Sequence, residues 1–397
     1  MIVRNVLRSR RFWLGVIGLI LCVAAIMTSG FVSTSDDPHF LVQRARVIEV
    51  EEGNLQPDPV VEGLYLGQQV AEVEILGGEF AGHRVRFVNT LSRFFNHNLT
   101  EGMEILVSVN THPDTGQIVF VDVFSHSRST FLYIFIAFFL LVLLVIGRRK
   151  GLYSALSLAF TLVMVIFFLI PRIIAGDSPV PFAVITAAFT TVFTILMVGD
   201  VSLKSIAAIG GTMVGVTCAG VISVIAGRLA HVSGMQMENA EAILIYADNP
   251  IRVPDLLFAG IIIAALGAVM DVAMSISSSV FEIKQASPKM DGKKLYKSGM
   301  RIGGDIMGTM SNTLILAFAG TSMIIMVIIA LYQLPYMRFI NLNLLAIEII
   351  QGLSASIGLI LTVPVTALLA ALLASNNKVS KFLKTKAKVV EQEQKEG

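Results

Sequence analysis

The stretch "LLFAGIIIAALGAVMDVAMSISSSV", residues 256–280, decides the class of fold. It is apolar throughout except for small hydroxyl residues and one ionisable side chain, Asp271. A helix needs about 20 mostly apolar residues to cross the hydrocarbon core of a bilayer. The stretch therefore predicts a transmembrane helix, and it raises the question of why a carboxylate stands inside it.

The composition of the whole chain extends this interpretation. Of 397 residues, 55% are hydrophobic and only 15% charged, and the mean hydropathy is +0.76. These values exclude an ordinary soluble domain and indicate a polytopic α-helical membrane protein. The same length criterion predicts about eight transmembrane helices, at 12–29, 130–147, 152–171, 180–199, 205–227, 256–280, 311–332 and 353–375.

Basic residues gather in four places that fix the orientation. They precede the first span, separate the second from the third, fill the predicted loop 281–305, and follow residue 375. With eight spans, all four clusters lie on one side, so the positive-inside rule predicts that both termini are cytoplasmic. The first span also resembles a cleavable signal peptide, with small residues at Thr28, Ser29 and Gly30. Cleavage would leave seven spans and an outer N-terminus.

The remaining segments define the domain organisation. Residues 1–30 form a basic start and the first span, 129–376 a transmembrane domain of about seven helices, and 377–397 a charged cytoplasmic tail. Residues 31–128 differ, because apolar residues alternate with polar ones in "RARVIEVEE" and "HRVRFVN". About five short strands predict a small extracytoplasmic β domain, an OB-like barrel or sandwich that packs on the membrane domain or a neighbouring subunit. Nucleic acid is excluded as a partner because this domain lacks a basic, aromatic-rich face.

Metal, redox and enzyme chemistry find little support. The six histidines match no zinc spacing, and both cysteines, Cys22 and Cys218, fall within predicted spans. No cofactor is expected. The chain contains no HExxH or GxSxG motif and no histidine inside a predicted span, so we do not expect an enzyme.

Asp271 belongs to a polar helix face. It follows Asp255 by sixteen residues and so lies ~24 Å along the helix, past the bilayer centre towards the cytoplasm. A lone charge at that depth costs at least ~2.5–3.5 kcal/mol, so the side chain should face the protein interior or water. Ser275 and Ser278 follow at helical spacing, and Gly267 extends the same side.

A second polar set lies in "SGMRIGGDIMGTMSNTLILAF", residues 298–318. Asp305, Thr309 and Asn312 fall on one helical face, next to Thr313. Oxygen ligands of this kind suit hard cations and can relay protons, so Asp271, Ser275, Ser278, Asp305, Thr309 and Asn312 are predicted to form one ion or proton site. In the alternative, these groups only hold helices together, and Asp305 pairs with Arg301.

Other residues predict helix packing. Gly211 and Gly215 form a small-xxx-small pair in "GGTMVGVTCAG", and Pro364 in "TVPVT" favours a kink. Gly267 is also predicted to serve helix packing. Residues 205–280 and 311–375 each read as helix, outer surface helix, helix. They are interpreted as two parallel copies, although few residues are identical between them in this alignment.

Two motifs carry a family resemblance. "ALGAVMDVAMSISSSVFEI", followed by "SGMRIGGDIMGTMSNTLILAFAG", resembles the YibE/F-like family of bacterial multispanning membrane proteins, and the "GGTMVGVTCAG" helix and the β region fit it as well. The resemblance implies a protein of the bacterial cytoplasmic (inner) membrane. It implies no substrate.

These observations favour a transporter or channel-like protein for an ion or small solute. Its partners would be the lipid bilayer, a small cation or proton, and further copies of itself as a homo-oligomer. A membrane scaffold or sensor, whose outer β domain binds a partner while the buried polar residues are structural, is the alternative.

Overall fold

A computed structural model describes residues 40–112, 116–199, 201–235, 240–246 and 250–375. The predicted first span and the predicted cytoplasmic tail lie outside these ranges. The chain divides into two compact units, with the boundary between Val142 and Leu143, and each is described here by itself.

The N-terminal unit is an antiparallel β half-barrel. Its strands are β1 (Phe40–Glu52), β2 (Gln56–Pro57), β3 (Tyr65–Ile75), β4 (Arg84–Leu91), β5 (Glu104–Thr111) and β6 (Ile118–His126). The strand order is β2-β3-β1-β5-β6, and β4 pairs with the free edge of β3. Alternate residues such as Val47, Val73 and Val107 fill its core, as the alternation in the sequence predicts.

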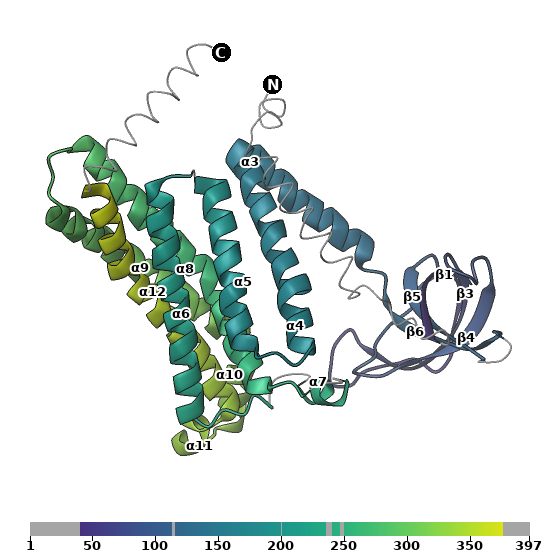
Figure 1. Cartoon of the computed structure of the whole chain (residues 1–397). Helices are drawn as coiled ribbons and strands as arrows, with labels where there is room; N and C mark the ends of the chain where they lie inside the picture. Colours follow the sequence, from purple (N-terminus) through teal and green to yellow (C-terminus); the bar gives the residue numbers. More distant parts are fainter. Residues whose placement is uncertain (1–39, 113–115, 200, 236–239, 247–249, 376–397) are drawn as a thin grey trace, which may run out of the picture. The chain divides into compact units, whose positions relative to one another are not determined.

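The helices belong mainly to the second unit (Figure 1). They are α3 (Ser129–Met164), the π-helical turn η1 (Val165–Leu169), α4 (Ile170–Ile174), α5 (Pro179–Thr194), the π-helical turn η2 (Ile195–Gly199), α6 (Leu203–Leu229), α7 (Ala240–Tyr246), α8 (Val253–Ala286), α9 (Gly292–Thr321), α10 (Met323–Tyr332), α11 (Tyr336–Ile340) and α12 (Asn343–Ser375). Five of the helical segments in the described ranges are long and apolar enough to cross a membrane, or six if the bent pair α9–α10 is one span. The fold is therefore that of a multi-pass membrane protein.

One of these segments, Ser129–Ile174, runs for 46 residues, too long for one crossing. It breaks at Arg148, whose φ of 49° is outside the helical region. The chain turns back so tightly there that a Cβ on Gly151 would overlap the carbonyl oxygen of Leu143. The break falls between the spans predicted at 130–147 and 152–171. The total of eight spans stays a prediction.

The last two predicted spans lie within longer helical segments. The seventh was expected at 311–332, but α9 begins at Gly292 and meets α10 at an angle of 61°. The eighth was expected at 353–375, but α12 begins at Asn343. The predicted loop 281–305 is mostly helix, because its basic residues lie on the end of α8 and the start of α9 rather than in irregular chain.

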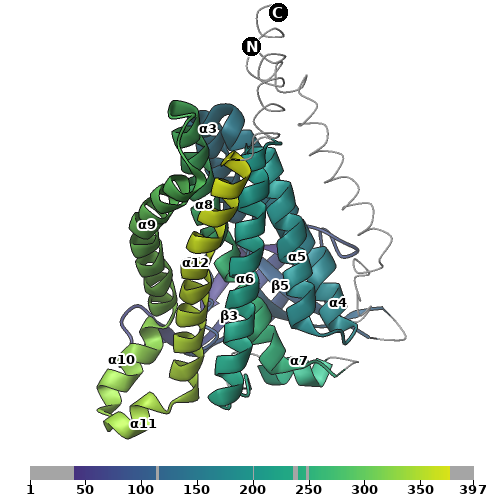
Figure 2. The same cartoon turned by 60° about the vertical axis from the view of Figure 1, so that its left-hand side comes forward.

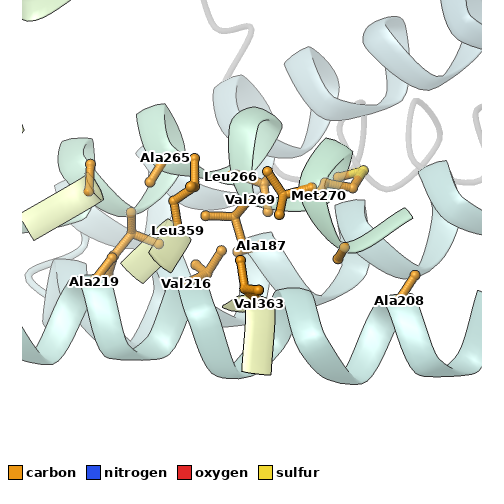
Figure 3. Close-up of a cluster of buried hydrophobic side chains, with 14 of the residues drawn as sticks. Ala187, Ala208, Val216, Ala219, Ala265, Leu266, Val269, Met270, Leu359 and Val363 are labelled. Atoms are coloured by element: carbon orange, nitrogen blue, oxygen red, sulfur yellow. The ribbon is translucent and has the colours of Figure 1, made fainter. Parts of the chain in front are cut away.

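Helices α6, α8 and α12 form the centre of the helical unit. Small and branched side chains from these helices and α5, including Ala187, Ala219, Val269 and Leu359, pack together (Figure 3). The approach of α6 to α12 depends on glycine, since a Cβ on Gly215 would overlap the hydroxyl of Thr362. Small residues at such contacts let membrane helices pack closely.

The corrected start of α9 makes an internal repeat visible. Residues 204–227 align without gaps to 297–320, at a constant separation of 93 positions. The identical pairs are Lys204/Lys297, Ser205/Ser298, Ile209/Ile302, Gly210/Gly303, Gly211/Gly304, Gly215/Gly308, Ile222/Ile315, Ala226/Ala319 and Gly227/Gly320.

The contacts of the two halves support the repeat. A Cβ on Gly210 of α6 would lie 2.7 Å from Leu369 on α12, and one on Gly303 of α9 would lie 2.9 Å from Ile276 on α8. Gly303 lies 93 positions after Gly210, and Leu369 lies 93 positions after Ile276. The same glycine contact therefore occurs twice, once with the glycine in the first copy and its partner in the second, and once the other way round. The repeat therefore consists of α6–α7–α8 and α9–α10–α11–α12, and its second copy starts earlier than the predicted residue 311.

Candidate functional site: a hydroxyl-lined cavity beside Asp271

A cavity of about 540 Å³ lies between the second arm of α3, the end of α5 with η2, and α8. Its one charged lining residue is Asp271. Four hydroxyl residues share the lining, namely Ser154, Ser157, Thr161 and Thr194. Apolar side chains, among them Leu158, Ile195 and Met274, complete the wall. The cavity thus has hydroxyl groups from two helices, α3 and α5, and one carboxylate from a third, α8, in its lining.

Local helix geometry places these hydroxyls. Ser154, Ser157 and Thr161 recur at helical spacing, so they lie on one face of the second arm of α3. Ser157 donates a hydrogen bond of 2.5 Å to Thr194 on α5 and fixes the two walls to each other. Immediately after Thr194 the helix changes to the π-helical turn η2, a feature that often occurs at functional sites.

Asp271 has an open environment on its helix. It is exposed, and among the described residues it makes neither a hydrogen bond nor an ion pair. The sequence predicts that this carboxylate faces the protein interior or water, and in the structure it lies in the cavity wall. A free carboxylate next to hydroxyl oxygens can bind a small hard cation or exchange a proton.

The other predicted residues of α8 lie beside the cavity. Ser275 is one turn beyond Asp271 and exposed, and Ser278 is half-buried one turn further. Neither lines the cavity. Gly267 does line it, and a Cβ there would meet no described atom within 4 Å. Gly267 was predicted to serve helix packing, but in the described chain it borders the open space instead.

The α9 residues are not brought to the same place. On α8 the side that meets α9 carries Ile276 and Val280, which lie about 140° and 180° around the helix from Asp271. On α9 the side that meets α8 carries Gly303, about 160° around the helix from Asp305. The two aspartates therefore point away from each other, and the expected shared site is not assembled.

The hydroxyls of α9 are occupied within their own helix. Thr309 donates to the carbonyl of Ile306 at 2.9 Å, and Thr313 donates to that of Thr309 at 2.9 Å. Asp305, Thr309 and Asn312 are all exposed. In the part of the chain that the structure places, Asp305 forms no ion pair with Arg301.

The residues predicted for packing fall into two kinds. Gly211 and Gly215 are buried, and their missing side chains admit Thr366 and Thr362 of α12. Pro364 lies inside α12, which continues as a helix on both sides of it.

Sequence reasoning missed the hydroxyls contributed by α3 and α5. The spacing of Ser154, Ser157 and Thr161 was a usable signal. Thr194 gave none, because only the fold brings it to Ser157.

A further carboxylate was missed because α12 starts ten residues before its predicted span. Glu348 lies in the second turn of α12 and faces an apolar pocket of about 360 Å³, with Phe318 and Ser322 at the α9–α10 bend. Its Oε2 atom is buried without a hydrogen-bond partner among the described residues. Glu348 is therefore a further carboxylate among the apolar helices, besides Asp271 and Asp305.

No group of three or more histidine, cysteine, aspartate or glutamate residues that could hold a metal ion occurs within the described ranges. Cys218 is a free, partly buried cysteine on α6.

Several helices long and apolar enough to cross a membrane, together with a β unit, define a polytopic membrane protein. The family model described as YibE/F-like protein matches residues 135–376, more than half of the chain. The chain belongs to the YibE/F-like family, as the resemblance of its two motifs predicted. No curated protein and no solved structure matches it.

Proposed function

We propose that this protein transports a small cation or protons across the membrane and that Asp271 binds the transported ion. The observation that carries the proposal is the position of an unpaired carboxylate in a cavity lined by four hydroxyl groups. A charge placed in a membrane helix is costly unless it faces water or a partner, and such charges commonly mark ion pathways.

The cavity walls favour movement over static binding. Helix α5 ends in the π-helical turn η2, and Ile195 and Val198 of η2 line the cavity, so one wall contains an irregular helical segment. The arm of α3 that carries Ser157 continues into the π-helical turn η1 beyond its lining residues. The protein is placed in the bacterial cytoplasmic membrane with both termini in the cytoplasm and the β unit outside. The distribution of Lys and Arg and the family resemblance support this placement. No enzymatic step is proposed.

Transport by purified protein in liposomes is the direct test. Entry of protons, K⁺, Na⁺ and Mg²⁺ is followed with ion-sensitive dyes for the wild-type chain and for Asp271→Asn. We expect at least one of these ions to move, and Asp271→Asn to reduce that flux to the level of empty liposomes. Asp271→Glu, which keeps the charge, should retain part of it.

The matched control is Glu282→Gln, which removes an exposed carboxylate from the same helix outside the cavity. This variant should transport normally. A flux that is equal in wild type and Asp271→Asn, with both proteins correctly inserted, contradicts the proposal. A loss of thermal stability in Asp271→Asn without any change in flux indicates a structural role.

A second function, that of a scaffold or sensor, has its own supporting observation in the β unit. Phe94 and Phe95 are 94% and 71% exposed, adjacent to each other in a tight turn. The neighbouring Arg93 holds this turn by a bidentate ion pair with Asp58, at 2.5 and 3.0 Å, and the Asp58 side chain is fully buried. A rigid aromatic tip is typical of a surface that binds a protein partner.

The strand order of the β unit, with β1 between β3 and β5, also supports an OB-like module, a fold that presents binding loops. A photoreactive residue at position 94 in native membranes tests the partner hypothesis. We expect one discrete adduct, absent when the probe stands at the exposed residue Val119. Equal labelling from both positions contradicts it.

A further inference from the structure

One face of α9 is polar and is covered by none of the residues that the structure describes. It consists of Arg301, Asp305, Gly308, Thr309 and Asn312, here called the α9 polar face, and all five residues are exposed. A Cβ on Gly308 would meet no described atom within 4 Å. Helix α9 lies at the edge of the helical unit, with its other side against α8 and α12 (Figure 2).

The contacts with α8 show how deep this face lies. Gly299 and Gly303 of α9 meet Val280 and Ile276 of the antiparallel α8, so Asp305 is level with Met274. Glu282 is the first charged residue of α8 after Asp271. Asp305 therefore lies ~12 Å inside the level of Glu282, and Asn312, level with Gly267, lies ~22 Å inside it. Lipid is a poor neighbour for an aspartate and an asparagine at these depths.

The internal repeat shows what such a face does elsewhere in the chain. At a separation of 93 positions, the α9 polar face corresponds to Ala208, Thr212, Gly215, Val216 and Ala219 of α6, and all five of these are buried. They form the helix contact with α12 and α8, in which Gly358 and Thr362 lie directly against Gly215. The same surface of the repeat is thus a helix-packing face in the first copy and an unoccupied one in the second.

We propose that the α9 polar face of one chain packs against the α9 polar face of a second copy, forming a two-fold dimer in the membrane. The face is self-complementary. Arg301 and Asp305 are opposite charges one turn apart, so in a parallel pair of helices each Arg301 reaches the Asp305 of the other chain. Gly304 and Gly308 allow the two backbones to approach, and the two Asn312 amides can bond to each other.

Cross-linking in native membranes tests the contact. In the full chain with Cys22→Ser and Cys218→Ser, Asn312→Cys is compared with Ala317→Cys, which is also exposed but lies about 140° around α9. Oxidation should give a disulfide-linked dimer at position 312 and at least about tenfold less at position 317, because the S–S bond needs closely apposed cysteines.

Charge exchange tests the pairing without removing the cysteines. Two differently tagged chains are produced together, one with Arg301→Asp and one with Asp305→Arg. The mixed dimer has two matched pairs, whereas a dimer of either variant with itself has two like-charge contacts. We expect the mixed pair to be recovered about tenfold more than either variant with itself.

An ion pair between Arg301 and Asp305 of the same chain cannot produce a preference for the mixed dimer. Equal cross-linking at positions 312 and 317 contradicts the dimer, as does a mixed pair recovered no better than the variants with themselves. Cross-linking of Asn312→Cys to a cysteine introduced in residues 12–29 of the same chain would instead assign the face to the predicted first span. Transport by Asp271 does not depend on any of these outcomes.

Discussion

Helices α8 and α9 carry the same local pattern with different surroundings. Each has an aspartate followed by small polar residues at helical spacing, and the two aspartates lie within about one helical turn of the same level. Yet Asp271 opens onto a cavity made by its own chain, and Asp305 points outward from the edge of the helical unit. Spacing along a helix identifies a polar face but does not identify what lies opposite that face.

The difference arises from the neighbours in the fold. The region around α8 is covered by the α3 arm and α5, which add hydroxyls around Asp271. No described helix covers the outer side of α9. We therefore expect the loss of the Asp271 carboxylate to affect ion transport, and the loss of the Asp305 carboxylate to affect the contact between two chains.

The largest expected effect is on transport. Asp271→Asn should abolish ion flux in proteoliposomes, because an amide carries no negative charge for the cation or proton. Asp305→Asn should leave the flux per inserted protein within about twofold of wild type, since Asp305 lies outside the cavity. Dye-based flux assays on both variants, matched for protein content, check this prediction. Equal loss in both variants would show that α8 and α9 serve one shared site after all.

The next effect concerns the equivalent glycines of the repeat. Gly215→Val should destabilise the fold by about 1–3 kcal/mol or more, because the new side chain overlaps Thr362. Gly308→Val meets no described atom and should leave the melting temperature of the chain nearly unchanged, while lowering the yield of the dimer. Thermal unfolding in detergent and cross-linking in membranes measure these two quantities. A similar loss of stability at both positions would contradict the assignment of Gly308 to a contact between chains.

The sequence predicted much of this fold because the signals were local. Apolar length predicted the helices from 130 to 280, alternation predicted the β unit, and spacing placed Ser275 and Ser278 on the side of Asp271. Prediction from the sequence failed where a helix is only partly apolar. The first turns of α9 are rich in basic residues and were therefore predicted as a loop. Residues 343–352 mix polar and apolar side chains, so the start of α12, which contains Glu348, was not predicted as part of a span. Thr194 could not be foreseen, because its contact with Ser157 exists only in three dimensions.

A smaller effect is expected from the hydroxyls of the cavity. Ser157→Ala removes the hydrogen bond to Thr194, worth about 1 kcal/mol, and should lower the apparent affinity for the transported ion by about fivefold. Ser275→Ala, on α8 but outside the lining, is the matched control and should behave as wild type. Concentration dependence of the flux measures both. An equal change in the two variants would indicate a general weakening of the helices.

The smallest expected effect is on the acid stability of the β unit. Its carboxylate Asp58 is paired with Arg93, whereas Asp271 has no partner among the described residues. Hydrogen bonds from Arg93, Val60 and Val61 hold the pKa of Asp58 well below its usual range. A carboxyl whose pKa is lowered by folding stabilises the fold above its unfolded pKa, about 4, and that contribution is lost as the pH falls towards the folded value. The protection factor of the amides in the segment that contains Asp58, which is the exchange rate of an unstructured chain at the same pH divided by the observed rate, should therefore fall in acid.

Asp58→Asn should remove most of this acid dependence. The control is Glu51→Gln, which breaks an exposed pair with Arg86 and should alter it little. If the protection factor of the segment is independent of pH in the wild type, the ion pair does not hold the Phe94–Phe95 turn.

Access of water to position 271 tests the central claim most directly. In the cysteine-free chain, Asp271→Cys is treated with a small charged thiol reagent from either side of the membrane. Ala273→Cys, whose position is fully buried in the helix core, is treated in the same way. The cavity account predicts rapid labelling of position 271 and none of position 273. Protection of position 271 to the same extent as position 273, in protein that labels fully after unfolding, would contradict it.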